Sequence, residues 1–307
     1  MGKQHLDREA CRNVLVVAIT PRREDRQVDL EGVQKNVRYL IKHSVDFIMP
    51  ECGTGMVYDA TLEEYEAVVG TYLDEAGDAA YIVPGIGPGF GRALEMGHIA
   101  RSLGVAGVMI MPVVGPASAN GVYNGFREIA KVVQLPTVLY QRRLDIMPVE
   151  DVVGLCELDE VIGLKYAVED LDAFDRIVEQ AGDRAAMVCG MAEDPCIDYM
   201  ARGAVGFSSG MANFVPRMSL TLHQKFAGGD RAEAGRIREL MVPFEDFRGE
   251  NGARYSGSAL HAAMDYAGLA GGPVIPFAED VGPQDLPRVH TMMDALMTEE
   301  TALRVST

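Results

Sequence analysis

Lys165 is the residue of this chain best suited to covalent chemistry. It lies in the apolar run 161–166, which otherwise has the composition of a buried strand, whereas the other five lysines fall in segments with helical spacing or at the terminus. A buried ammonium is costly unless it is paired or deprotonated, and a neutral amine can attack a ketone to form a Schiff base. The alternative is a lysine that reaches from a strand end to water or pairs with a carboxylate.

A Gly53-Thr54-Gly55 turn follows a second apolar run, and Tyr140 ends a third. The backbone N–H groups of such a turn, together with the Thr54 hydroxyl, make a cradle for a carboxylate, although an ordinary strand-to-helix turn also requires glycine. A tyrosine at a strand end packs as an amphipathic ring. If it faces a Schiff-base lysine, it can instead relay protons.

Further candidates come at the ends of later runs. Arg142 and Arg143 follow Tyr140 and are suited to binding a distal carboxylate, with a solvated loop pair as the alternative. Gly190 and Ser208-Ser209 end two more runs and are expected to line the same pocket.

Other chemistries find less support. The six histidines lie mostly in segments with helical spacing, so no metal site is expected. Cys189 lies near a strand end, but no histidine is placed to activate it, which favours a small buried thiol. The sequence has neither a GxSxG elbow nor a P-loop.

Apolar, β-branched runs alternate with stretches of helical spacing and would position these side chains. The runs are 14–20, 46–50, 80–86, 107–112, 136–140, 161–166, 185–191 and 204–209. Eight such strands alternating with helices predict an α/β fold, a closed (β/α)8 TIM barrel, in which catalytic groups gather at the carboxyl ends of the strands. The alternative is an open, doubly wound sheet. Such a sheet usually binds a nucleotide at its first turn, but residues 19–22, at the end of the first strand, include no glycine that could cradle a pyrophosphate.

After the eighth unit only helices are predicted, over 231–242, 256–267 and about 284–297, with turn residues at 247–252. The sequence therefore predicts a catalytic barrel over 12–228 and a C-terminal helical extension over 229–307 that packs on it.

Composition limits the possible partners and compartment. The formal charge of −17 disfavours nucleic acid and anionic membrane surfaces as partners. Five cysteines without CxxC spacing suit a reducing cytoplasm. The first residues have no apolar signal core, and no run is long enough to cross a membrane.

Several of these motifs together resemble the dihydrodipicolinate synthase/N-acetylneuraminate lyase family over about residues 12–298. The motifs are Thr20-Pro21, Gly53-Thr54-Gly55, Leu139-Tyr140, Gly163-Leu164-Lys165, Gly190, Asn213-Phe214-Val215-Pro216 and the three-helix tail. The resemblance implies a class I, metal-free lyase without a cofactor, in which Lys165 forms an imine with a 2-oxo acid. It also implies a homotetramer or homodimer.

The resemblance also assigns individual positions. Tyr140 matches the family's tyrosine on the fifth strand, and Gly53 and Thr54 match the positions that hold the 2-oxo carboxylate. Ser208 matches a pocket position on the eighth strand.

Five positions depart from the synthase pattern: Met56 replaces a glutamate, Val113 and Val114 an aromatic pair, Gln141 an asparagine and Asp145 an arginine. These departures speak against lysine biosynthesis.

The motifs are most similar to the 5-dehydro-4-deoxyglucarate dehydratase branch, in which a sugar diacid loses water and carbon dioxide through the lysine imine. We therefore expect a sugar-acid dehydratase or a pyruvate-releasing aldolase. The alternatives are a dihydrodipicolinate synthase-type condensation and a non-catalytic barrel that binds a 2-oxo acid.

Overall fold

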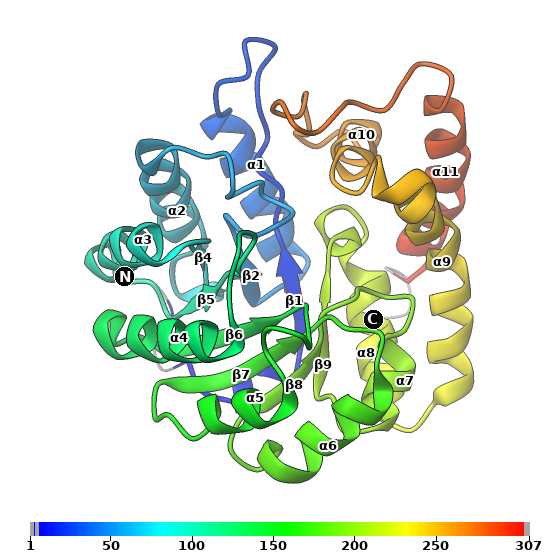
Figure 1. The fold of residues 1–307 in the computed structure, drawn as a ribbon. Helices are drawn as coiled ribbons and strands as arrows, with labels where there is room; N and C mark the ends of the chain where they lie inside the picture. The colour runs from blue at the N-terminus through cyan, green and yellow to red at the C-terminus, as the bar shows by residue number, and fades with distance from the viewer. Residues whose placement is uncertain (1–2, 4–5, 304–307) are drawn as a thin grey trace.

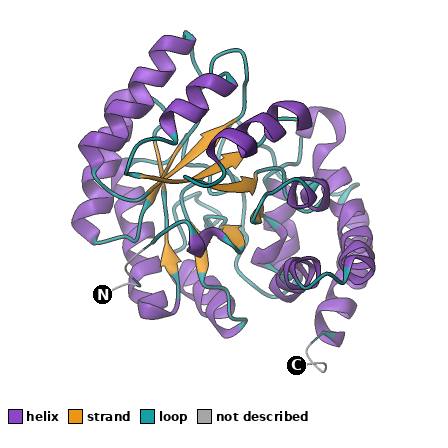
Figure 2. Ribbon diagram, turned by 90° about the horizontal axis from the view of Figure 1, so that it is seen from below, coloured by secondary structure: helices purple, strands orange, loops and turns teal. Residues whose placement is uncertain are grey.

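A parallel sheet curls into a barrel at the centre of the molecule, with helices around it (Figures 1 and 2). The computed structural model describes residues 3 and 6–303. Within these residues the sheet has nine strands, all parallel. The strands are β1 (Val14–Val17), β2 (Phe47–Met49), β3 (Tyr81–Ile82), β4 (Gly85–Ile86), β5 (Val108–Ile110), β6 (Thr137–Gln141), β7 (Val161–Tyr166), β8 (Ala186–Cys189) and β9 (Gly206–Ser209).

The pairing order closes the barrel. It runs β3-β2-β1-β9-β8-β7-β6-β5-β4, so the two edge strands, β3 and β4, are neighbours in the sequence. Only Val83 and Pro84 separate them. The predicted (β/α)8 barrel is therefore confirmed, and the open-sheet alternative is wrong.

The run predicted over 80–86 corresponds to two short strands, β3 and β4, that follow one another between β2 and β5. The Val83 N–H donates to the carbonyl of Ile48 in β2 at 2.9 Å, and the Pro84 carbonyl accepts from the N–H of Met109 in β5, also at 2.9 Å. Both neighbours continue past Pro84, since the Gly85 N–H donates to the Pro50 carbonyl at 3.2 Å, and proline only removes one N–H from the pairing.

In the described part of the chain, eight helices follow the strands and cover the barrel. They are α1 (Leu30–Lys42), α2 (Leu62–Ala76), α3 (Phe90–Leu103), α4 (Ala119–Val133), α5 (Val149–Leu155), α6 (Leu171–Ala181), α7 (Cys196–Ala201) and α8 (Pro216–Ala227). Local signals set their starts: Asp29 caps α1 by accepting from the Gly32 N–H, and Thr61 and Glu64 form a capping box at α2.

Three further helices form the extension on one side of the barrel, coloured yellow to red in Figure 1. They are α9 (Arg231–Ala253), α10 (Ser258–Tyr266) and α11 (Leu286–Ala302). The helix expected to end at residue 242 continues through Pro243, and the predicted break lies at 250–252, where Asn251 and Gly252 have positive φ. A single apolar core runs from the barrel into the extension.

The turn at residues 228–230 separates α8 from α9. The division into 12–228 and 229–307 stays a prediction, and its last four residues lie outside the described part of the chain. Among the described residues, no helix is long and apolar enough to cross a membrane.

Candidate active site

Lys165 and Tyr140 are neighbours on adjacent strands. They are register partners in the parallel pair β6–β7. Side chains alternate between the two faces of a strand, and Tyr166 packs on Phe174 of α6 and on Tyr199 of α7. Tyr166 therefore faces the helices, whereas Lys165 and Tyr140 face the interior of the barrel.

The Lys165 amine is buried without a carboxylate partner. The residue is 5% exposed, and its Nζ lies 3.7 Å from the centre of the Tyr140 ring. Throughout residues 3 and 6–303, no aspartate or glutamate forms an ion pair with it. The two structural alternatives, a lysine that reaches into water and a lysine held in an ion pair, therefore do not describe this residue.

The neighbours of Tyr140 lower the pKa of its phenol. Burial raises this pKa, but the positive charges of Lys165 and Arg142 and a hydrogen bond with Lys165 lower it, and the net pKa is below the ordinary value. A phenol of lowered pKa gives up its proton more readily to a neighbouring acceptor.

The turn after β2 presents unused hydrogen-bond donors. The Gly53 carbonyl accepts from Met56 N–H at 3.1 Å, and the Cys52 carbonyl accepts from Val57 N–H at 3.2 Å. The N–H groups of Gly53, Thr54 and Gly55, and the Thr54 hydroxyl, make no hydrogen bond to another described residue. Such a turn is suited to a carboxylate.

These groups surround a cavity of about 350 Å³. Its lining includes Gly53, Thr54, Tyr140, Arg142, Lys165, Gly190 and Ser208 from the barrel. Seven of the nine site residues that we predicted from the sequence therefore line one cavity.

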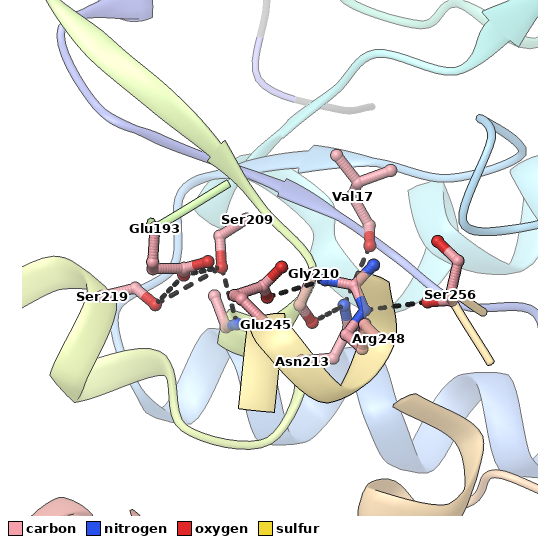
Figure 3. Close-up of polar contacts among 10 residues, drawn as sticks. Val17, Glu193, Ser209, Gly210, Asn213, Ser219, Glu245, Arg248 and Ser256 are labelled. Atoms are coloured by element: carbon pink, nitrogen blue, oxygen red, sulfur yellow. Dashed lines mark hydrogen bonds and ion pairs between the residues drawn. The ribbon is translucent and has the colours of Figure 1, made fainter. Parts of the chain in front are cut away.

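Two of the nine do not line it. The Ser209 hydroxyl points away and bonds with Glu193 and with the Ala212 N–H (Figure 3). Gly55 packs against β1, where an added Cβ would lie 3.1 Å from the Ala18 carbonyl oxygen.

The extension supplies a wall of the cavity that was not predicted from the sequence. Glu245, Arg248, Ser256 and Gly257 line the cavity opposite the barrel residues. Arg248 donates through Nη1 to both Glu245 oxygens at 2.7 and 2.8 Å and through Nε to the Ser256 carbonyl at 2.8 Å (Figure 3). Tyr58 and Met191 were missed as well, because they lie in loops beyond the strand ends.

The departures from the synthase pattern lie at or near this cavity. Met56 lines it, and its Cε lies 3.2 Å from the position of a Cβ at Gly257. Val114 is 70% exposed and lines an adjoining cavity of about 420 Å³. Arg143 lines that second cavity and is paired with Asp145 at 2.5 Å, whereas Arg142 lines both.

Two buried glutamates lie next to the site. Glu51 precedes the turn, and its Oε1 accepts from the Thr20 hydroxyl at 2.5 Å. Burial raises its pKa to about 7, against the Thr20 hydrogen bond and the charge of Arg22. Burial likewise raises the pKa of Glu193 to about 7, and the charge of Glu245 adds to the effect.

The surroundings of Cys189 do not activate its thiol. Burial raises the pKa of the Cys189 thiol to about 12, which leaves it a poor nucleophile. Among the described residues, no group of three or more histidine, cysteine, aspartate or glutamate side chains is arranged to hold a metal ion.

The chain is similar to known proteins over most of its length. The model of the dihydrodipicolinate synthetase family matches residues 10–292. A relative in Streptomyces avermitilis, a probable 5-dehydro-4-deoxyglucarate dehydratase, is 29% identical over 276 residues, which cover 85% of this chain and 86% of the relative. A probable 5-dehydro-4-deoxyglucarate dehydratase of Bacillus subtilis is 26% identical, with 89% and 91% covered.

Solved structures agree with the fold. The dihydrodipicolinate synthase of Bacillus clausii superposes with a TM-score of 0.90 at 28% identity, covering 94% of this chain and 98% of that one. A catalytic lysine mutant of the Ruminococcus gnavus sialic acid aldolase has a TM-score of 0.87 at 16% identity, with 98% and 99% covered, which shows the fold alone. The chain is therefore a lyase and belongs to the dihydrodipicolinate synthetase family.

Proposed function

We propose that this protein is a Schiff-base lyase of 2-oxo acids and that its substrate is a sugar diacid of the 5-dehydro-4-deoxyglucarate type. The observation that carries the proposal is the Lys165 amine, which is buried beside Tyr140 without a carboxylate partner among the described residues. The names of the similar proteins favour a dehydratase over an aldolase.

The geometry supports a simple sequence of steps. The substrate carboxylate next to the ketone lies on the free N–H groups of Gly53 and Thr54, and the Lys165 nitrogen attacks the ketone carbon. The carbinolamine loses its hydroxyl as water and leaves a protonated imine, with Tyr140 moving the protons. No metal is needed, because the imine itself accepts the electron pair.

The imine then allows elimination. A proton leaves the carbon next to the imine carbon, and the hydroxyl on the following carbon departs with a proton as water. Loss of the far carboxylate as carbon dioxide sends its electron pair toward the imine and leaves an enamine, which becomes an imine again when a carbon of the enamine takes up a proton. Hydrolysis restores Lys165 and releases a 2-oxo acid that is shorter by one carbon.

The test is sodium borohydride reduction in the presence of pyruvate, followed by intact and peptide mass measurement. We expect a stable adduct on the peptide that carries Lys165, and none in Lys165→Ala. Lys225→Ala, an exposed lysine paired with Asp230, is the matched control and should trap as the parent does. An adduct on another lysine, or none with any 2-oxo acid, would overturn the proposal.

Turnover separates the remaining alternatives. Release of carbon dioxide from 5-dehydro-4-deoxyglucarate supports the dehydratase, whereas release of pyruvate from a sugar acid supports the aldolase. Trapping without turnover of either would indicate a binding barrel. We also propose a homotetramer or homodimer in a reducing cytoplasm, supported by the family and by five free, buried cysteines.

A further inference from the structure

Arg248 brings a positive charge into the active-site cavity from outside the barrel. It lies on α9, yet it lines the same cavity as Lys165 and Ser208. Its Nη1 lies 3.5 Å from the position of a Cβ at Gly210, directly after β9. The lack of a side chain at Gly210 thus gives the guanidinium room at the carboxyl end of the barrel.

The guanidinium is held in one orientation. Glu245 holds Nη1, and the Ser256 carbonyl holds Nε (Figure 3). The Nη2 group makes no hydrogen bond to another described residue, and its two hydrogens stay available. An arginine fixed in this way loses little side-chain freedom when it binds an anion.

Arg248 is also the more shielded of the two arginines in the cavity. Its side chain is 13% exposed and that of Glu245 is 12% exposed, whereas Arg142 is exposed. A carboxylate is attracted more strongly by a cation that is partly withdrawn from water, because the solvent screens the pair less.

The charges of the cavity suit a dianion. Arg142, Arg248 and the protonated imine on Lys165 are cationic and Glu245 is anionic, which leaves two net positive charges in a chain whose net charge is −17. The turn at Gly53 and Thr54 accounts for one carboxylate beside the ketone. The second negative charge then requires a donor on another wall.

We infer that Arg248, through Nη2, binds the second carboxylate of a 2-oxo diacid whose first carboxylate lies on the turn at Gly53 and Thr54. The extension thereby selects diacids over monoacids. This inference rests on the proposed function, since it places the substrate by its imine with Lys165.

Borohydride trapping tests the inference. The quantity measured is the concentration of each 2-oxo acid at which adduct formation reaches half of its maximum, called half-saturation below. The probes are pyruvate, 2-oxohexanoate and 2-oxoadipate, the last two being six-carbon acids that differ in the terminal carboxylate. In the parent, 2-oxoadipate should half-saturate at a concentration about 10- to 100-fold below that of 2-oxohexanoate, the range expected for a hydrogen bond between charged groups. This comparison needs no variant.

Variants then assign the effect to the residue. Arg248→Met should remove most of the preference for 2-oxoadipate and change the half-saturation by pyruvate by less than about threefold, since an interaction at the far end does not touch pyruvate. Arg248→Lys, which keeps the charge, should retain part of the preference. Arg254→Met removes an exposed arginine of the same extension, paired with Glu279, and should behave as the parent.

The outcomes separate this inference from the proposed function. Equal half-saturation by the two six-carbon acids in the parent overturns the role of Arg248. The role of Arg248 is also overturned if the preference for 2-oxoadipate survives Arg248→Met but is lost in Arg142→Met. The same holds if Arg248→Met raises the half-saturating concentrations of all three probes by the same factor. Pyruvate trapping on Lys165 would leave the proposed function standing in each of these cases, whereas trapping of no acid at all would overturn both.

Discussion

The side chain of Lys165 lies directly over Gly190. A Cβ at position 190 would stand 2.9 Å from Lys165 Cγ and 2.8 Å from the carbonyl oxygen of Tyr166. Carbon atoms in van der Waals contact are about 3.5 to 4.0 Å apart, so no other residue type fits here without moving the lysine or its strand. Glycine at the end of β8 therefore positions the amine.

We expect Gly190→Ala to fold but to form the imine poorly. The methyl group would push the Lys165 chain away from Tyr140, and displacement of a reacting group by about 1 Å can cost about 100-fold in rate. The measurement is the rate of borohydride trapping with pyruvate, together with circular dichroism. Gly70→Ala is the control, because a Cβ at this α2 position meets no atom within 4 Å. Trapping at the parent's rate in Gly190→Ala would contradict the role given to this glycine.

Tyr140→Phe should separate imine formation from proton transfer. The ring that lies 3.7 Å from Lys165 Nζ remains, and only the hydroxyl is lost. We expect kcat to fall by about 100- to 10,000-fold, the usual contribution of a positioned acid or base, while trapping still reaches full extent.

Tyr58→Phe is the matched control for this prediction. Tyr58 lines the same cavity, but burial raises the pKa of its phenol to about 12, whereas that of Tyr140 is below the ordinary value. Its loss should lower kcat by less than about tenfold, since a phenol of raised pKa gives up its proton less readily than one of lowered pKa. Equal losses in the two variants would show that Tyr140 has no special role.

The sequence predicted the barrel and its lysine because both depend on local patterns. Buried parallel strands are apolar almost throughout, so Lys165 stood out within its run. The pairing of Tyr140 with Lys165 followed from the barrel geometry, because consecutive strands of this type are neighbours. The apolar run over 80–86 likewise predicted the third position of the barrel, which β3 and β4 occupy together between β2 and β5.

The contribution of the extension could not be predicted from spacing. Glu245 and Arg248 form an i, i+3 pair on α9, and so do Glu233 and Arg236. The two pairs look alike in the sequence, but the first is 12% and 13% exposed in the cavity wall, whereas the second is 30% and 45% exposed on the surface. Only the way in which α9 packs on the barrel distinguishes them.

The alternation of side chains explains why only one of two adjacent serines reaches the cavity. Ser208 lines it, and Ser209, on the opposite face of β9, bonds to the buried Glu193. The sequence offered both as candidates, because β9 is short and carries no charged residue that would mark its inner face. The burial of Glu193 was also unforeseen, since carboxylates are rarely buried.

The five cysteines should be unreactive in the folded protein. All are free and buried, and burial raises the pKa of Cys52 and Cys156 to about 12, as it does for Cys189. Because the thiolate is the reactive form, we expect Ellman's reagent to modify the native protein slowly and to count five thiols after denaturation. Rapid reaction of one thiol in the native state would contradict this placement.

Glu51 should make the stability of the protein fall as pH rises. Burial raises its folded pKa to about 7, above the ordinary value of 4.5, so the folded state holds a proton that the unfolded state has lost. The free energy of unfolding should therefore decrease between about pH 4.5 and pH 7 and then level off. Glu51→Gln cannot ionise, so its stability relative to the parent should rise across this window by on the order of 3 kcal/mol.

Urea unfolding at pH 5 and pH 8 measures this difference. Glu279→Gln is the control. The hydrogen bond from Arg254 lowers the pKa of Glu279, so this exposed carboxylate is largely ionised in both the folded and the unfolded state at pH 5 and at pH 8. The stability of that variant relative to the parent should therefore be nearly the same at the two pH values. A Glu51→Gln variant whose stability relative to the parent is the same at pH 5 and pH 8 would show that Glu51 is ionised in the folded protein. Its carboxylate, next to the turn at Gly53 and Thr54, would then oppose the binding of an anionic substrate.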